Sequence, residues 1–340
     1  MRGIFGFGVV ALGWVVTSSL SFAADGPPPW AYGFPGPAPT NASAAPSGGR
    51  GGGRGAGQPP TAPDTTLRHV PGSTLEFTRA EISNGFGPAD WFPGDHPTMP
   101  DIVSHGRQPD VRACALCHYP NGKGRAENAG VSGLPVSYFI EQMHEFRDGN
   151  RKSADTRKAN TNLMIAIARG MTEDETKAAA EYFGSMKAGR WIKVVETATV
   201  PKTRIAGGLF IKLDGNETEP IGDRLIEVPE NSEATEILRN PRSPFIAYAP
   251  PGSLKKGEAL VAMGVGKTVQ CGACHGADLR GMGPVPGIAG RSPSYLVRQM
   301  YDMQAGTRKG EWTELMKPVV EKLSAEDMLN IAAYCASRQP

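Results

Sequence analysis

Two copies of the pattern Cys-x-x-Cys-His constrain the fold of this chain more than any other feature of its sequence. The first copy occupies residues 114–118 and the second residues 271–275, a separation of 157 residues. Further residues match at this separation: Gly130 with Gly287, Tyr138 with Tyr295, Gln142 with Gln299, Gly149 with Gly306, and Arg151 with Arg308. Matches in register across a whole segment indicate an internal duplication, which predicts two similar folding units.

Each motif has the spacing that covalent attachment of a haem c requires. Two thiols three positions apart can reach both vinyl groups of one porphyrin, and the adjacent histidine then lies under the iron. A redox-active cysteine pair favours a βαβ setting and a zinc site needs a second pair of ligands, and neither motif has such a context. We therefore expect two covalently bound haems c, each with one iron. The predicted attachment residues are Cys114, Cys117 and His118 in the first repeat and Cys271, Cys274 and His275 in the second.

The sixth ligand of each iron is predicted to be a methionine, because a soft thioether favours ferrous iron and raises the reduction potential. Met164 and Met316 match each other across the repeat and precede the last helix of each unit. We expect this segment to be a loop from which the side chain reaches the open face of the haem. The other candidates, most of them expected in the core, are Met143, Met171, Met300, Met303 and Met328.

Histidine is the alternative sixth ligand. His69, His96 and His105 precede the first motif, and one of them could ligate the first iron, although a surface or core histidine is the more frequent case. His144 has no counterpart in the second repeat, where Tyr301 stands.

Each iron-binding histidine also needs an acceptor for its second ring nitrogen. The loop after the second motif can offer the carbonyl of Pro286, and Ala129 stands at the matching place in the first repeat. The fifth cysteine, Cys335, matches Phe183, and we expect a small buried apolar residue there.

The start of the chain has the pattern of an export signal. Arg2 is followed by an apolar run over residues 4–16, and small residues suggest cleavage near Ala23 or Ala24. An uncleaved membrane anchor is the alternative, but the run is short for a membrane span. The formal net charge is only +2, which does not favour binding to nucleic acid or to an anionic membrane. We expect a periplasmic protein without a transmembrane segment in its mature form.

Composition divides the rest of the chain into four parts. Residues 25–68 are rich in Pro, Gly, Ala and Ser and predict a disordered tether, in which Trp30, Tyr32 and Phe34 would be solvated or dock on a partner or on the body of the protein. Residues 69–188 and 250–340 contain the two repeats, each with a helix after the motif and a last helix that begins with a capping pair. Residues 189–249 are rich in β-branched residues and predict short strands in a linker.

These motifs resemble the two-domain dihaem class I cytochromes c. The resemblance covers residues 100–188 and 250–340 and rests on the Tyr-x-x-x-Gln helix, the Gly-x-Arg after it, the methionine, and the start of the last helix. Tyr119 departs from the family, which usually has glycine there. The resemblance implies a mainly α fold of two tandem class I cytochrome c-like helical domains joined by a short β-containing linker.

The function predicted from the sequence is single-electron transfer in the periplasm, from a dehydrogenase donor towards an oxidase or another cytochrome, by a chain that is not itself an enzyme. The absence of a recognisable set of substrate-binding residues supports this interpretation. The alternative is a dihaem enzyme, such as a thiosulfate dehydrogenase or a peroxidase. A ligand sensor is a third possibility, but the sequence offers no output domain for it.

Overall fold

The computed structural model describes residues 26–37 and 64–340 of the chain. The predicted export signal, residues 1–24, therefore lies outside the described residues, and so does most of the predicted tether. Among the described residues, no helix has the length and apolar character needed to cross a membrane.

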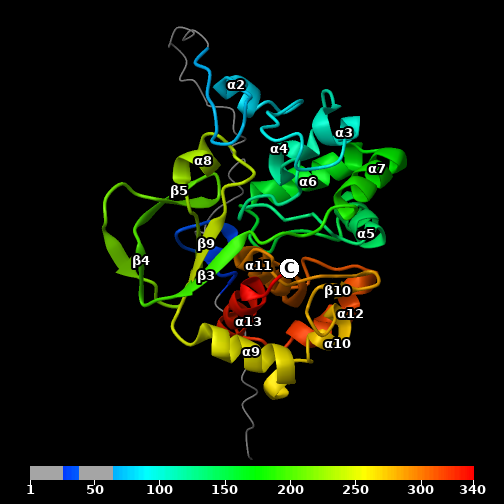
Figure 1. Cartoon of the computed structure of the whole chain (residues 1–340). Helices are drawn as coiled ribbons and strands as arrows, with labels where there is room; N and C mark the ends of the chain where they lie inside the picture. The colour runs from blue at the N-terminus through cyan, green and yellow to red at the C-terminus, as the bar shows by residue number, and fades with distance from the viewer. Residues whose placement is uncertain (1–25, 38–63) are drawn as a thin grey trace, which may run out of the picture.

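The first repeat is a cluster of helices with a short covering segment before it (Figure 1). The predicted helix after the motif is confirmed as α5, and the last helix, α7, begins with a capping box between Thr172 and Glu175. Leu163 and Ile167 lie one turn apart on α6 and pack in the same core as Phe183 of α7. The elements are α2 (Arg79–Ile82), α3 (Asp101–Ser104), β1 (Gly106–Arg107), β2 (Val111–Arg112), α4 (Cys114–His118), α5 (Val136–Arg147), α6 (Ala159–Gly170) and α7 (Glu173–Gly184).

The second repeat has the same order of helices after its motif. Its last helix, α13, begins with a capping box between Ser324 and Asp327 and buries Met328, Ile331 and Cys335 on one face, as the sequence predicts. The elements are α9 (Ser253–Met263), the 3₁₀-helix η1 (Gly264–Gly266), α10 (Gly272–His275), β10 (Gly281–Met282), β11 (Val285–Pro286), α11 (Pro293–Gln304), α12 (Glu311–Val320) and α13 (Ala325–Ser337).

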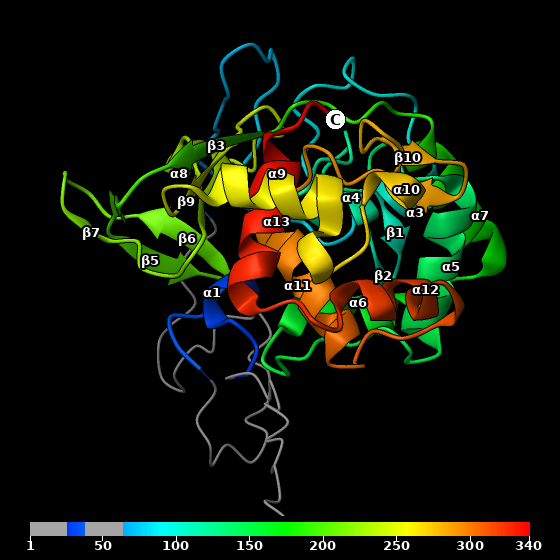
Figure 2. The same ribbon diagram turned by 90° about the horizontal axis from the view of Figure 1, so that it is seen from below.

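The segment between the repeats forms strands that are more extensive than the short linker predicted. A three-stranded sheet has the order β3-β9-β8, in which β3 and β9 are parallel, and two further pairs join β4 with β7 and β5 with β6. Figure 2 shows these strands beside α9 and α13 of the second repeat. The elements are β3 (Ile192–Glu196), β4 (Thr199–Pro201), β5 (Thr203–Ala206), β6 (Leu209–Lys212), β7 (Thr218–Pro220), β8 (Ile226–Pro229), α8 (Ser232–Glu236) and β9 (Phe245–Ala249).

One apolar core joins this sheet to the second repeat and to the start of the chain. Ile226 and Phe245 of the sheet, Leu329 of α13, and Trp30 and Tyr32 of α1 (Pro29–Tyr32) belong to the same buried cluster. The prediction of a disordered, solvated tail is therefore wrong for residues 26–37. Two large aromatic side chains there are removed from water, and their burial offsets the entropy of ordering this short segment.

Candidate functional site

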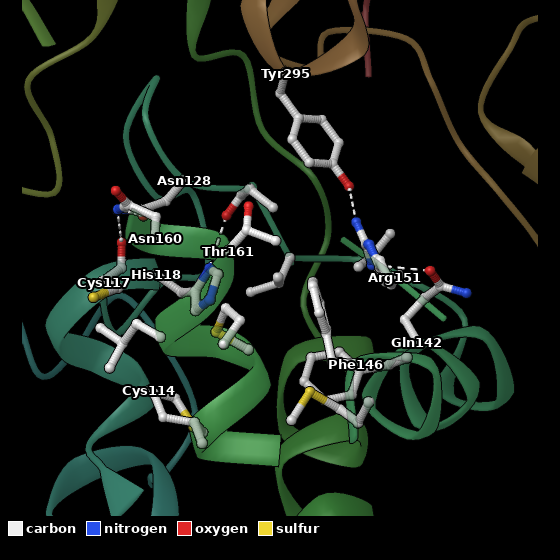
Figure 3. A pocket seen from close by; sticks show the side chains of 18 of the residues that line it. Cys114, Cys117, His118, Asn128, Gln142, Phe146, Arg151, Asn160, Thr161 and Tyr295 are labelled. Atoms are coloured by element: carbon white, nitrogen blue, oxygen red, sulfur yellow. Dashed lines mark hydrogen bonds between the residues drawn. The ribbon is translucent and has the colours of Figure 1, made fainter. Parts of the chain in front are cut away.

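The first motif lies on α4, at the wall of a mainly apolar cavity of about 140 Å³. Cys114 and Cys117 line this cavity together with His118, whose Nδ1 lies 2.8 Å from the carbonyl oxygen of Ala129 (Figure 3). The predicted hydrogen bond in this repeat is thus confirmed. It leaves Nε2 of His118 as the ring nitrogen that can bind a metal in the cavity.

The second motif has the same geometry around α10 and a cavity of about 230 Å³. Nδ1 of His275 lies 2.8 Å from the carbonyl oxygen of Pro286, which confirms the second predicted hydrogen bond. Cys271 and Cys274 line this cavity with it. Burial lowers the pKa of both histidines below its usual value, which keeps the imidazoles neutral and able to bind iron.

Met164 and Met316 line the first and second cavities respectively. The sequence placed them in loops, and this is wrong: Met164 lies on α6 and Met316 on α12. A thioether on a helix beside the cavity is more firmly positioned than one on a loop. Other methionines also line the cavities, namely Met143 and Met171 in the first and Met300 and Met303 in the second, whereas Met328 does not.

The remaining histidines lie away from both cavities. Nε2 of His96 lies 3.1 Å from Oδ2 of Asp90, and Nε2 of His144 lies 2.8 Å from Oε2 of Glu173. His69 and His105 are exposed. Among the described residues, the linings of the two cavities therefore contain no histidine other than His118 and His275.

Both cavities suit a haem c in the chemistry of their donors. Each presents two thiols, a neutral imidazole held by a carbonyl, and a thioether, in a mainly apolar wall. The two cavities also adjoin, because they share several lining residues. The shared residues are Leu134, Tyr138, Gln142, Tyr295 and Gln299.

A buried polar network crosses the boundary between the cavities. Arg151 donates to Oε1 of Gln142 in its own repeat and to the hydroxyl of Tyr295 and Oε1 of Gln299 in the other, each at 2.9 Å. Arg308 makes the mirrored set with Gln299 at 3.0 Å, Tyr138 at 3.0 Å and Gln142 at 2.9 Å. The sequence shows these residues as repeat matches, but it does not show that each arginine reaches into the opposite repeat.

The first cavity also has a charged side that sequence reasoning missed. Lys158 and Arg298 line it, and so do Glu127 and Asp302. Burial is the main reason why the pKa of Lys158 falls to about 7, and Arg298 lowers it further. The carboxylates of Glu127, Asp155 and Asp302 oppose this lowering of the pKa without cancelling it.

No family model matches the chain. It is 40% identical over 79 residues to cytochrome c-554(548) of Halomonas halodenitrificans, covering 23% of this chain and 95% of that protein. It is 38% identical over 86 residues to cytochrome c4 of Azotobacter vinelandii, covering 23% of this chain and 41% of that protein. It is 25% identical over 236 residues to a thiosulfate dehydrogenase electron acceptor of Stutzerimonas stutzeri, covering 68% of this chain and 82% of that protein.

Two kinds of protein with solved structures are similar to this chain. Cytochrome c4 of Acidithiobacillus ferrooxidans has a TM-score of 0.42 and 20% identity, and covers 66% of this chain and 97% of that chain. A thiosulfate dehydrogenase of Marichromatium purpuratum has a TM-score of 0.43 and 24% identity, and covers 67% of this chain and 37% of that chain.

These comparisons correct the prediction that the chain is not an enzyme. The relatives from Stutzerimonas stutzeri and Thiomonas intermedia each align with 68% of the chain, and both are named after thiosulfate dehydrogenase. The cytochrome c4 of Azotobacter vinelandii aligns with only 23%. The sequence did not reveal this because the haem motifs are common to carriers and to enzymes of this kind.

Proposed function

The chain belongs to the dihaem cytochrome c family and carries two covalently bound haems c. We propose that it is an oxidoreductase that accepts electrons in the oxidation of thiosulfate. The observation that carries this proposal is the pair of adjoining cavities with matched donor sets. Each bound haem supplies an iron that takes up and releases one electron. Joining two thiosulfate ions through a sulfur–sulfur bond releases two electrons, which equals the capacity of two such sites.

The residues of the chain hold the two sites in one rigid arrangement. His118 and His275 would bind the iron of each haem through Nε2, because their Nδ1 atoms donate to the carbonyls of Ala129 and Pro286. The thiols of Cys114, Cys117, Cys271 and Cys274 would form the thioether bonds to the two haems. The arginine–tyrosine–glutamine network between the cavities fixes their separation, and the apolar walls exclude water.

Met164 and Met316 are the proposed sixth ligands, supported by their place in the cavity linings and their match across the repeat. Replacing either by histidine should lower the potential of one haem by a sizeable part of the roughly 0.8 V range that axial ligands span. The same change should halve the far-red methionine-to-iron absorption band. Met143→Leu and Met300→Leu are the matched controls, and an unchanged band in Met164→His would reject this ligand.

Export to the periplasm is part of the proposal, supported by the signal pattern before Ala24. The partners would be redox proteins there, a donor connected with thiosulfate oxidation and an oxidase or cytochrome as acceptor. We also propose that the two repeats are two domains joined by the β-containing segment between residues 188 and 250. The residue matches between the repeats support this arrangement.

The test is reduction of the oxidised holoprotein by thiosulfate, followed through visible absorption of the haems. One sample receives thiosulfate alone and another receives thiosulfate with a purified thiosulfate dehydrogenase. Reduction in the first sample would assign the oxidation step to this chain, and reduction only in the second would assign to it the role of electron acceptor. If ascorbate reduces the haems but neither sample does, the proposal is wrong.

A further inference from the structure

Lys158 is a buried cation on the wall of the first cavity whose charge is poorly compensated. Its side chain is almost fully buried, with 4% of the residue exposed, and its Nζ donates one hydrogen bond, to the carbonyl oxygen of Tyr32 at 3.3 Å. Three carboxylates face it, those of Glu127, Asp155 and Asp302. A buried ammonium group in this position needs an anion nearby, because desolvating an unpaired charge is costly.

Each of these three carboxylates has another partner. Glu127 forms a close ion pair with Arg125 through Oε1, while its Oε2 is buried without a hydrogen-bond partner among the described residues. Asp155 pairs with Arg157 at 2.7 Å. Asp302 accepts from the hydroxyl of Tyr32 at 2.7 Å and from the backbone N–H of Ala154 at 2.8 Å. Among the described residues, none of the three carboxylates forms an ion pair with Lys158, so its charge remains available to an anion inside the cavity.

The N-terminal segment holds Lys158 in this place. The carbonyls of Ala31 and Tyr32 accept from Arg298 and Lys158 respectively, so the segment aligns two cations on one side of the cavity. The turn between β5 and β6 packs against the same segment, and a Cβ added at Gly208 would lie 3.5 Å from Nζ of Lys158.

The second cavity has no lysine that matches Lys158; its cations are Arg308 and Arg291, and Arg291 donates to the backbone carbonyls of Gly287 and Gly130. At the separation that links Met164 to Met316, Lys158 corresponds to Gly310. The described lining of the second cavity contains arginines but no lysine, whereas Lys152, the other lysine of the first cavity, is exposed and screened by solvent. The two cavities therefore differ in the residues that carry their buried charge, although the residues that would bind iron match.

We propose that Lys158, positioned by the carbonyl of Tyr32, is the counter-charge to a carboxylate of the haem at the first motif and raises the reduction potential of that haem relative to the second. Lys158 lines the first cavity beside Arg298 and Asp302 of α11, and a carboxylate of a haem held in this cavity would find its cation there. A cation there favours the reduced iron, which carries one positive charge fewer. This inference rests on the proposed attachment of the first haem through Cys114 and Cys117.

The experiment is an equilibrium redox titration of the holoprotein with Lys158→Met, in which the Met164→His variant identifies the signal of the first haem. We expect the equilibrium constant for electron transfer from the first haem to the second to rise about tenfold in this variant. For a one-electron couple this corresponds to a fall of about 59 mV in the potential of the first haem relative to the second. Lys158→Arg keeps the positive charge and should therefore show little of this shift. Lys123→Met replaces a partly buried lysine that lines neither cavity, and it should leave both potentials unchanged.

An unchanged equilibrium in Lys158→Met, or an equal shift of both haems, would overturn the inference. If this variant does not retain both haems, Lys158→Gln keeps a polar chain of similar length, and the same relative shift decides the question. The titration uses neither thiosulfate nor a partner protein. A negative result here therefore leaves the proposed role in thiosulfate oxidation intact, and failure of that role leaves this measurement valid.

Discussion

The residue that follows each Cys-x-x-Cys-His motif has a backbone conformation that glycine adopts readily and other residues do not. Tyr119 has φ 62° and ψ 155°, and its counterpart Gly276 has φ 82° and ψ 150°. This region of conformational space costs a residue with a Cβ about 1–3 kcal/mol. The ring of Tyr119 is buried and lies 5.8 Å from the guanidinium of Arg239, so packing holds the strained backbone.

We predict that Tyr119→Gly is more stable than Tyr119→Ala by about 1–2 kcal/mol. Both variants lose the buried ring, so their difference isolates the backbone. At an ordinary helical position the order is reversed, because glycine loses more entropy on folding. Urea unfolding of the holoprotein measures the difference, and Leu116→Gly against Leu116→Ala within α4 is the control. An alanine variant at position 119 as stable as the glycine variant would contradict the prediction.

The sequence predicts the donor residues of the site better than their surroundings. The spacing of the motifs assigns the cysteines and histidines, and the loop sequence assigns the carbonyls of Ala129 and Pro286, because these are local relations along the chain. The contact between Lys158 and Tyr32 joins residues 126 positions apart and has no periodic or local signal. A charged residue in a polar loop of this kind gives no indication that it is buried.

At the scale of elements, the helices α6 and α12 could not be predicted from their local sequence. The start of α6 is rich in asparagine and threonine, and α12 contains Pro318 followed by two valines, so local preference disfavours a helix in both segments. Packing reverses this preference, because Leu163 and Ile167 of α6 enter the core of the first repeat. Helices with strong local start signals, α7 and α13, were predictable from their capping pairs alone.

Glu227 connects the sheet to the second repeat and makes stability depend on pH. It lies on β8 and is fully buried, and its Oε2 accepts from the hydroxyl of Ser292 at 2.7 Å and from the backbone N–H of Ser294 at 3.3 Å, at the start of α11. Burial raises the pKa of this carboxyl, although its hydrogen bonds oppose the shift. The folded protein therefore binds a proton here more tightly than the unfolded chain does.

We predict that Glu227 makes the free energy of unfolding fall as the pH rises above the unfolded pKa of about 4.5 and through the raised folded pKa. Glu227→Gln keeps the size and an acceptor oxygen but cannot ionise, so it should flatten this part of the pH profile. Urea unfolding of both proteins between about pH 5 and 8 measures it. Glu230→Gln, at a nearby exposed carboxylate, is the control, and a profile unchanged by Glu227→Gln would refute the assignment.

At the scale of the whole molecule, the duplication brings identical residues of the two repeats together. Arg151 and Arg308 form an isolated antiparallel bridge through their backbones, and their side chains exchange tyrosine and glutamine partners across the boundary. The sheet and α1 pack in one core with the second repeat. The first repeat is thus joined to the rest of the described molecule partly through this symmetric network.

The symmetry makes a quantitative prediction. Tyr138→Phe removes one hydrogen bond to Arg308, and Tyr295→Phe removes the equivalent bond to Arg151, each from a buried charged donor. Each change should lower the free energy of unfolding by about 1.5–3 kcal/mol, and the two losses should agree. Tyr301→Phe on α11, outside the network, is the control. Unequal losses in urea unfolding would mean that one arginine holds the repeats together without the other.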